Sequence, residues 1–222
     1  MKIMNVAIDG PSGSGKSTLS RKAAENLGFI YVDTGAMYRT IGLYAYRLGI
    51  PVDSVEPITE HLSEISISLK YQNGEQLIFL GEEDVSKEIR THIISSYASA
   101  VAKIPTVRAF LLERQRLIAK ENCVIMDGRD IGTVVLPDAD VKIFLTASPE
   151  VRANRRYAEL KERGQQIDYQ QLLQDIIDRD YQDSHREIAP LKPSETSIVL
   201  DTSELDFNQS LDKLISIIKE KI

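Results

Sequence analysis

The sequence is poor in the residues from which disulfides and zinc sites are built. It contains one cysteine, three histidines and no tryptophan. A single cysteine cannot form a disulfide within the chain, so we expect a reducing, cytoplasmic compartment. His61, His92 and His185 lie far apart and match no metal-ligand spacing, so we interpret them as structural residues.

The sequence also lacks long apolar runs and an excess of positive charge. No apolar run approaches the ~20 residues of a membrane span, and the N-terminus lacks the pattern of a signal peptide. The formal net charge of −6 disfavours a general nucleic-acid or anionic-membrane surface. We therefore expect neither nucleic acid nor a membrane as a partner, and any cationic chemistry must be local. A length of 222 residues favours one domain with an insertion.

The most informative stretch is the run Gly10-Pro11-Ser12-Gly13-Ser14-Gly15-Lys16-Ser17, which matches G-x-x-x-x-G-K-[ST] without a mismatch. A short apolar, strand-like segment precedes it, and residues 17–27 carry apolar positions at helical spacing. Backbone N–H groups of such a loop form an anion nest at a helix N-terminus. The lysine would reach the β- and γ-phosphates, and the final serine hydroxyl would ligate Mg²⁺. A chance match in a Gly/Ser-rich turn is the alternative, but the flanking strand and helix favour binding of a nucleoside triphosphate.

Strand-like and helical segments alternate along most of the chain, which predicts a parallel sheet covered by helices. The predicted strands are residues 5–9, 29–33, 123–127, 141–145 and 197–201. The predicted helices are residues 17–27, 36–48 with Thr34 as N-cap, 89–103, 107–121, 149–161, 169–185 and a last one with an apolar face around residues 211–218.

One segment has a different pattern. Residues 65–69 and 76–80 have strand character, with apolar and polar residues alternating in the first, and Asn73-Gly74 lies between them. Period-two alternation around an Asn-Gly pair predicts a β-hairpin. We therefore expect an antiparallel insertion over roughly residues 55–90.

The glycine-rich run of residues 10–17, a P-loop, occurs in kinases, motors and switch GTPases, so it does not by itself distinguish these classes. The Asn-Lys-x-Asp motif that reads guanine is missing, whereas arginines follow two predicted strands and lie on two polar helices. Ligands of open α/β sheets bind outside the carboxyl ends of the strands, and guanidinium groups grip phosphate bidentately. This pattern favours a second phosphorylated substrate beside ATP. The alternative for each arginine is an ion pair on a solvated helix face.

Several motifs together resemble bacterial cytidylate kinase, from the first strand to about Asp201. Besides the P-loop they are Asp33-Thr34-Gly35-Ala36-Met37-Tyr38-Arg39, Glu88-Ile89-Arg90-Thr91, Asp127-Gly128-Arg129-Asp130-Ile131-Gly132-Thr133-Val134-Val135 and Arg179-Asp180 with Arg186-Glu187-Ile188-Ala189-Pro190-Leu191. The resemblance implies ATP + CMP ⇌ ADP + CDP in pyrimidine nucleotide metabolism, with dCMP also accepted and Mg²⁺ as cofactor. It also implies a monomer with an α/β nucleoside monophosphate kinase fold, whose five-stranded parallel sheet has the order 2-3-1-4-5.

The resemblance further divides the single domain by role. Residues 1–54, 91–150 and 190–222 would form the core, about 55–90 the insertion that binds the monophosphate, and about 151–189 a helical lid with its following helix.

The resemblance assigns roles to individual residues. The ATP phosphates would be cradled by Gly10, Pro11, Ser12, Gly13, Ser14, Gly15, Lys16, Ser17 and Thr18, with Ser17 on the metal. The CMP site would consist of Arg39, Arg129 and Arg186 at the phosphate, Arg179 and Asp183 at the ribose, Ser99, Arg108 and Asp130 at the cytosine, and Thr34 as a small hydroxyl residue. The catalytic groups would be Lys16, Arg129 and the lid arginines Arg156 and Arg152, or Arg155 in place of Arg152.

Elementary chemistry agrees with the base-reading set. Asp130 would accept a hydrogen bond from the N4 amino group of cytosine while Arg108 donates to N3 or O2. Uracil would present O4 to the carboxylate and N3–H to the guanidinium, a mismatch that discriminates strongly when buried. The alternatives are that Arg108 is a surface cation and that Asp130 pairs with Arg129.

The nucleophile would be a CMP phosphate oxygen that is already ionised, so in-line transfer needs no catalytic base. Two other functions stay open from the residues alone: a kinase of the same fold acting on UMP or a metabolite such as shikimate, and a nucleotide switch without an acceptor.

Overall fold

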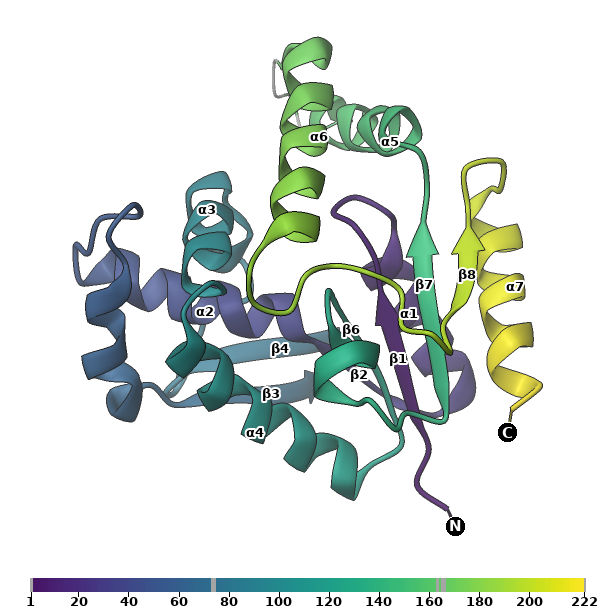
Figure 1. Cartoon of the computed structure of the whole chain (residues 1–222), viewed down its shortest axis with the longest axis horizontal. Helices are drawn as coiled ribbons and strands as arrows, with labels where there is room; N and C mark the ends of the chain where they lie inside the picture. The colour runs from purple at the N-terminus through teal and green to yellow at the C-terminus, as the bar shows by residue number, and fades with distance from the viewer. Residues whose placement is uncertain (1, 73–74, 163, 165–166, 222) are drawn as a thin grey trace. The chain divides into compact units, whose positions relative to one another are not determined.

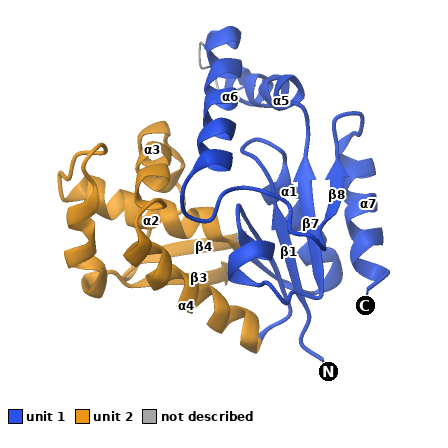
Figure 2. Ribbon diagram, in the orientation of Figure 1, with its two compact units in different colours: residues 1–31, 122–222 blue, residues 32–121 orange. Residues whose placement is uncertain are grey.

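The computed structural model describes residues 2–72, 75–162, 164 and 167–221. The chain forms two compact units, one made of Met1–Tyr31 with Asn122–Ile222 and the other of Val32–Glu121 (Figure 2). Each unit has its own apolar core. The division by substrate-binding role expected above stays a prediction, because compactness does not report which residues bind a ligand.

A five-stranded parallel sheet is the centre of the first unit, and the last two residues of its strand β2, Val32 and Asp33, already belong to the second unit (Figure 1). The strand order is β2-β6-β1-β7-β8, which is the predicted order 2-3-1-4-5 when only these strands are counted. β1 lies between β6 and β7, with Val6 opposite both Ile125 and Val141. Apolar side chains fill β1 because it is covered on both faces. The strands are β1 (Asn5–Asp9), β2 (Ile30–Asp33), β6 (Val124–Gly128), β7 (Val141–Thr146) and β8 (Ile198–Asp201).

In the described part of this unit, four helices and one short helical turn accompany the sheet. Leu19 of α1 and Leu214 of α7 belong to the same apolar cluster as Ile8 and Ile143 of the sheet, so both helices pack on the strands. The elements are α1 (Lys16–Leu27), the turn η3 (Ile131–Val135), α5 (Pro149–Glu162), α6 (Tyr169–His185) and α7 (Phe207–Lys219). The predicted α/β fold is confirmed, and α6 has the predicted bounds. η3 was not predicted.

Aspartate side chains begin three of the helices. Asp33 accepts a hydrogen bond from Ala36 N at the start of α2, and Asp168 and Asp206 do the same for α6 and α7. An N-cap carboxylate satisfies one of the backbone donors that the first helical turn leaves without partners. The prediction of Thr34 as the cap of α2 was wrong, because the carboxylate one residue earlier takes that position and Thr34 is the first helical residue.

The second unit consists of helices around a small antiparallel sheet of order β3-β4-β5. The predicted hairpin is confirmed by the pairing of Ile67 with Leu80 and of Leu69 with Ile78, while its Asn73-Gly74 turn lies outside the described residues. The predicted helix 89–103 was wrong at its start, because Thr91 caps a helix that begins only at His92. The elements are α2 (Thr34–Arg47), the 3-10 turn η1 (Glu56–Glu64), β3 (Ile67–Gln72), β4 (Glu75–Leu80), β5 (Glu83–Asp84), the 3-10 turn η2 (Glu88–Arg90), α3 (His92–Val101) and α4 (Pro105–Glu121).

α2 and α3 pack closely at Gly42. A Cβ atom on Gly42 would lie 2.9 Å from Tyr97 Cβ and 3.0 Å from the backbone nitrogen of Ala98. Only glycine allows the two helices this approach. Across both units, none of the helices in the described part of the chain has the length and apolarity that crossing a bilayer demands.

Candidate active site

The P-loop joins the end of β1 to the start of α1. Gly15 is the N-cap residue of α1 with φ of 85°, and neither a capping side chain nor an acidic residue covers the first turn of this helix. A Cβ on Gly10 would lie 2.0 Å from Leu145 O, so the loop can pass this strand only with glycine. Ser14 Oγ is fully buried and has no hydrogen-bond partner among the described residues. Backbone donors, helix dipole and a buried hydroxyl together form an anion site.

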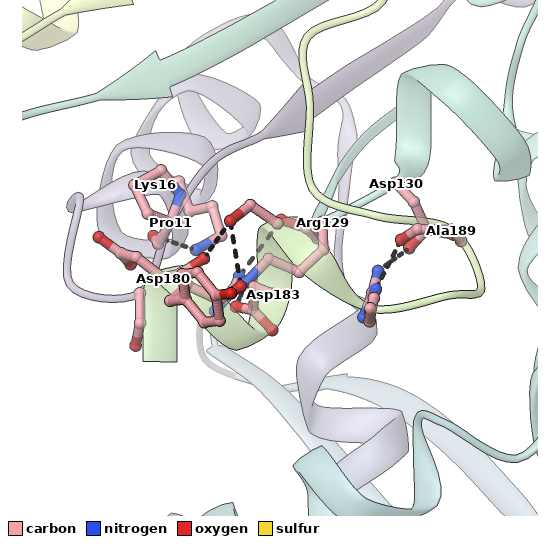
Figure 3. A network of polar contacts seen from close by, with 12 residues as sticks. Pro11, Lys16, Arg129, Asp130, Asp180, Asp183 and Ala189 are labelled. Atoms are coloured by element: carbon pink, nitrogen blue, oxygen red, sulfur yellow. Dashed lines mark hydrogen bonds and ion pairs between the residues drawn. The ribbon is translucent and has the colours of Figure 1, made fainter. Parts of the chain in front are cut away.

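Lys16 is buried against this loop, and its Nζ donates to Pro11 O at 3.0 Å. Burial lowers the pKa of Lys16 to about 7, assisted by the neighbouring charges of Arg129 and Arg179 and opposed by Asp127 and Asp183. Figure 3 shows Lys16, Arg129 and Asp183 gathered beside the loop. An anionic ligand beside Lys16 would offset the burial and the neighbouring positive charges, and would therefore favour the protonated, charged form of the Lys16 amine.

Ser17 meets a carboxylate that the sequence analysis did not single out. Its Oγ donates to Asp127 Oδ2 at 2.7 Å, and Tyr31 Oη donates to Asp127 Oδ1 at 3.2 Å. Asp127 is 2% exposed and lies on β6, the strand beside β1. The signal in the sequence was its place near the end of a buried strand, where open α/β sheets bind ligands. A hydroxyl and a carboxylate oxygen are hard donors of the kind that Mg²⁺ prefers.

A second set of polar contacts joins the loop after β6 to α6 and to the segment that follows α6. Arg129 Nε donates to Asp183 Oδ2 at 2.8 Å, and Arg186 Nη2 donates to Asp130 Oδ1 at 3.5 Å (Figure 3). Arg186 Nε also donates to Ala189 O at 2.6 Å. Arg129 is thus ion-paired with Asp183 and Asp130 with Arg186, while the alternative that Asp130 is an ion-pair partner of Arg129 stays a prediction.

Positive charge dominates around Asp183. Burial raises the pKa of this carboxyl, but Arg129, Arg179 and Arg186 outweigh burial and hold its pKa below the usual range. Three guanidinium groups around one carboxylate leave a local excess of positive charge. Such an excess suits a phosphate dianion, which guanidinium groups bind in bidentate fashion.

The arginines of α5 differ from one another in burial and partners. Arg152 is 2% exposed, and its guanidinium donates to Ala147 O at 2.9 Å, to Ser12 O at 3.0 Å and to both carboxylate oxygens of Asp180. Arg155 donates to Thr202 O at 2.8 Å, and Arg156, which is exposed, donates to Glu159 at 3.0 Å. Arg152 thus connects the P-loop to α5 and α6, whereas Arg155 and Arg156 point to other partners.

The remaining predicted CMP residues belong to the second unit and are described within it. Arg39 Nη2 donates to Asp33 Oδ2 at 2.9 Å, and Arg39 Nε is buried with no partner among the described residues. Arg108 is 9% exposed, donates to Ala102 O at 3.3 Å and lies 5.9 Å from the centre of the Tyr38 ring. Its interpretation as a surface cation was therefore wrong. Thr34 is buried at the start of α2, and Ser99 is partly buried on α3.

The sequence model of the cytidylate kinase family matches residues 6–220. A cytidylate kinase of Caldicellulosiruptor saccharolyticus is 51% identical over 217 residues, which cover 98% of this chain and 96% of the relative. A cytidylate kinase of Streptococcus pyogenes serotype M5 is 47% identical over 222 residues, or 100% of this chain and 96% of the relative. Among solved structures, an uncharacterized protein from Eubacterium ventriosum shares the fold with a TM-score of 0.52 at 14% identity, covering 97% of this chain and 98% of that one. The resemblance inferred from the motifs is confirmed, and the chain belongs to the cytidylate kinase family of phosphotransferases.

Proposed function

We propose that the chain transfers the γ-phosphoryl group of Mg-ATP to the phosphate of CMP, and of dCMP, by direct in-line attack. Cytidylate kinase activity itself follows from the full-length similarity to curated cytidylate kinases. The observation that carries the residue-level proposal is the gathering of Lys16, Arg129 and Arg186 with Asp127 and Asp183 around the loops that follow β1 and β6.

The donor side of the reaction belongs to the P-loop. The backbone of residues 10–18 would cradle the phosphates of ATP, as the glycine geometry and the uncapped N-terminus of α1 support. Lys16 would leave Pro11 O and donate to the β- and γ-phosphates. In that position its charge would offset the negative charge that develops on the transferred group.

The acceptor side uses the arginine groups. Arg129 and Arg186, together with Arg39 of the second unit, would hold the CMP phosphate, while Arg179 and Asp183 would face its ribose. Arg39 Nε is buried and has no hydrogen-bond acceptor among the described residues. A buried donor without an acceptor costs free energy, and a phosphate oxygen of CMP would supply that acceptor, which supports this role.

Base selection is proposed for Asp130, Arg108 and Ser99. Asp130 is 5% exposed and Arg108 is 9% exposed, so a mismatched base would leave their polar groups unsatisfied away from water. Sites that hydrogen-bond their substrate in this way reject analogues strongly.

The oxygen ligands present fit magnesium. Ser17 Oγ would ligate the ion and Asp127 would assist from β6, with ATP phosphates supplying further oxygens. When bound, Mg²⁺ supplies charge neutralisation on the phosphates. Among the residues that the structure describes, no three acidic, histidine or cysteine side chains cluster, so the protein's share of the coordination would be small.

The lid roles of Arg152 and Arg156 stay predictions. Arg156 is the exposed one of the two, and among the described residues its guanidinium would leave only the nearby Glu159 carboxylate, so we propose it as the arginine that reaches the transferred phosphoryl group. Arg152 would act beside the P-loop through its bond to Ser12 O. Closure over the site would keep water from ATP.

The deciding experiment measures ADP production from Mg-ATP with CMP, dCMP, UMP, AMP, GMP, dTMP or no acceptor. We expect fast turnover with CMP and dCMP, weak turnover with UMP and almost none without an acceptor. Equal rates with UMP would contradict the base-reading roles of Asp130 and Arg108. Turnover that ignores the acceptor would contradict phosphoryl transfer to CMP and leave a nucleotide switch.

A further inference from the structure

The helical turn η3 is capped from a distant part of the chain. Asp130 occupies its N-cap position, where an aspartate ordinarily accepts a backbone hydrogen bond from its own helix, but the Asp130 side chain makes no such bond. Instead, Asp9 Oδ1 accepts from Ile131 N at 2.7 Å and Asp9 Oδ2 accepts from Gly132 N at 2.8 Å. One carboxylate from β1 therefore satisfies the first two donors of η3.

Asp9 lies where the contact with η3 can connect two loops of the candidate site. Asp9 is the last residue of β1, is 3% exposed and directly precedes the P-loop. In the pairing of β1 with β6 it lies opposite Gly128, the residue before Arg129. The strand pairing and the carboxylate thus fix the loop of residues 129–132 to the start of the P-loop at two successive points. Gly132 permits the approach, since a Cβ there would lie 3.3 Å from Asp9 Oδ2.

The contact between Asp9 and η3 also bears on where the Asp130 side chain finds its partner. Aspartate side chains compete for nearby backbone donors, and an N-cap aspartate has the donors of its own turn within reach. Here Asp9 already occupies the Ile131 and Gly132 donors, and the Asp130 carboxylate points to Arg186 instead. Asp130 is the carboxylate proposed to accept from the cytosine amino group.

We propose that Asp9 is a positioning residue for base selection: by capping η3 in place of Asp130, it keeps the Asp130 carboxylate turned away from the η3 backbone donors, so that this carboxylate can accept from the base. The proposal rests on the proposed function, in which Asp130 distinguishes cytosine from uracil. Asp9 itself touches neither substrate in this scheme and acts only through Asp130 and its loop.

The test is Asp9→Asn, which keeps the shape of the side chain but leaves one backbone donor facing an amide NH₂. That backbone N–H of η3 then becomes available to the Asp130 carboxylate as a hydrogen-bond donor. We expect the preference for CMP over UMP in kcat/KM to fall by roughly tenfold or more, with the KM for ATP nearly unchanged. A loss of stability alone would lower the active fraction for both substrates equally and leave this ratio constant.

The matched control is Asp206→Asn. Asp206 caps α7 through Gln209 N at 2.8 Å, so the control makes the same chemical change at another helix cap of the same unit. Its CMP-to-UMP ratio should equal that of the wild type. The double variant with Asp130→Asn should be no less selective than Asp130→Asn alone, because Asp9 acts through Asp130.

A folded Asp9→Asn protein with the wild-type ratio would overturn the proposal, and so would an effect that adds fully to that of Asp130→Asn. If Asp9→Asn does not fold, Gly132→Ala perturbs the same contact from the loop side, and an unchanged ratio there would overturn the proposal equally. A wild-type protein without any preference for CMP would instead count against the proposed function, so the two failures are distinguishable.

Discussion

Lys16 is the single side chain on which phosphoryl transfer should depend most. We predict that Lys16→Ala lowers kcat/KM by roughly a hundredfold or more, because a charge aimed at the transferred group is lost. The fold should survive, since Lys16 contacts a loop carbonyl and lies outside the apolar cores. Steady-state kinetics and circular dichroism would measure both properties.

The control for this substitution lies on the same helix. Lys22 is exposed and contacts Glu25 three residues along α1, so Lys22→Ala should retain wild-type kinetics. A folded Lys16→Ala protein with near-normal turnover would remove Lys16 from the proposed chemistry.

The ionisation of Asp9 should also contribute to the pH dependence of the free energy of unfolding. Burial raises its pKa to about 6, with Asp130 assisting and Lys16 and the two backbone donors opposing. The folded state therefore binds this proton more tightly than the unfolded chain, in which the pKa of Asp9 has its ordinary value of 3.8. As pH rises from about 4 to about 6, the proton is lost and this group's contribution to the free energy of unfolding falls by roughly 3 kcal/mol.

Urea unfolding of wild type and Asp9→Asn at several pH values would check this expectation. The stability of wild type relative to the variant should be greater near pH 4 than near pH 7. A constant difference across that window would show that Asp9 has an ordinary pKa.

At the same scale, the sequence predicted residues whose pattern is local and missed those whose partners are remote. Lys16 follows from the P-loop spacing, and Arg129 from its place after a strand. Asp127 and Asp9 were not predicted as site residues, because their contacts join residues 110 and 122 positions apart. Strand pairing brings those residues together, and a single sequence does not display it.

At the scale of elements, the packing of α2 against α3 is the most sensitive contact. Gly42→Ala would raise helix propensity, which alone would stabilise α2 by about 1 kcal/mol. The added Cβ would lie 2.9 Å from Tyr97 Cβ, so the helices must separate. We predict a net loss of roughly 1–3 kcal/mol in the free energy of unfolding.

Urea denaturation would measure this loss. The control is Ser96→Ala on the exposed face of α3, which should change stability by less than about 0.5 kcal/mol. A Gly42→Ala protein more stable than the wild type would show that the helix contact adjusts freely.

Elements with a long pattern or a distinctive neighbouring motif were predicted well, and very short ones without either were not. α6 extends over 17 residues, and β1 is a buried apolar run that leads directly into the glycine-rich loop, so both have the predicted bounds. β5, with two residues, and η2, with three, are too short to carry a period. η3 depends on a cap supplied by Asp9, which no local pattern contains.

At the scale of the whole molecule, we expect a monomer. Sedimentation equilibrium should give the chain mass of 24.9 kDa at micromolar concentration, with and without ATP and CMP. A mass twice as large that depends on concentration would contradict this expectation. The sheet order could be predicted from the family resemblance, whereas the division into two compact units could not, because it depends on contacts between distant segments.

The burial of Lys16 has a consequence for the heat of nucleotide binding. With a pKa lowered to about 7, part of the Lys16 population lacks its proton near neutral pH. ATP favours the ammonium form, so binding should draw a proton from the buffer. Isothermal titration calorimetry should then give a binding enthalpy that varies with the ionisation enthalpy of the buffer, and Lys16→Ala would report the share that comes from ATP itself. Equal proton uptake in both proteins would mean that Lys16 is fully charged before the nucleotide arrives.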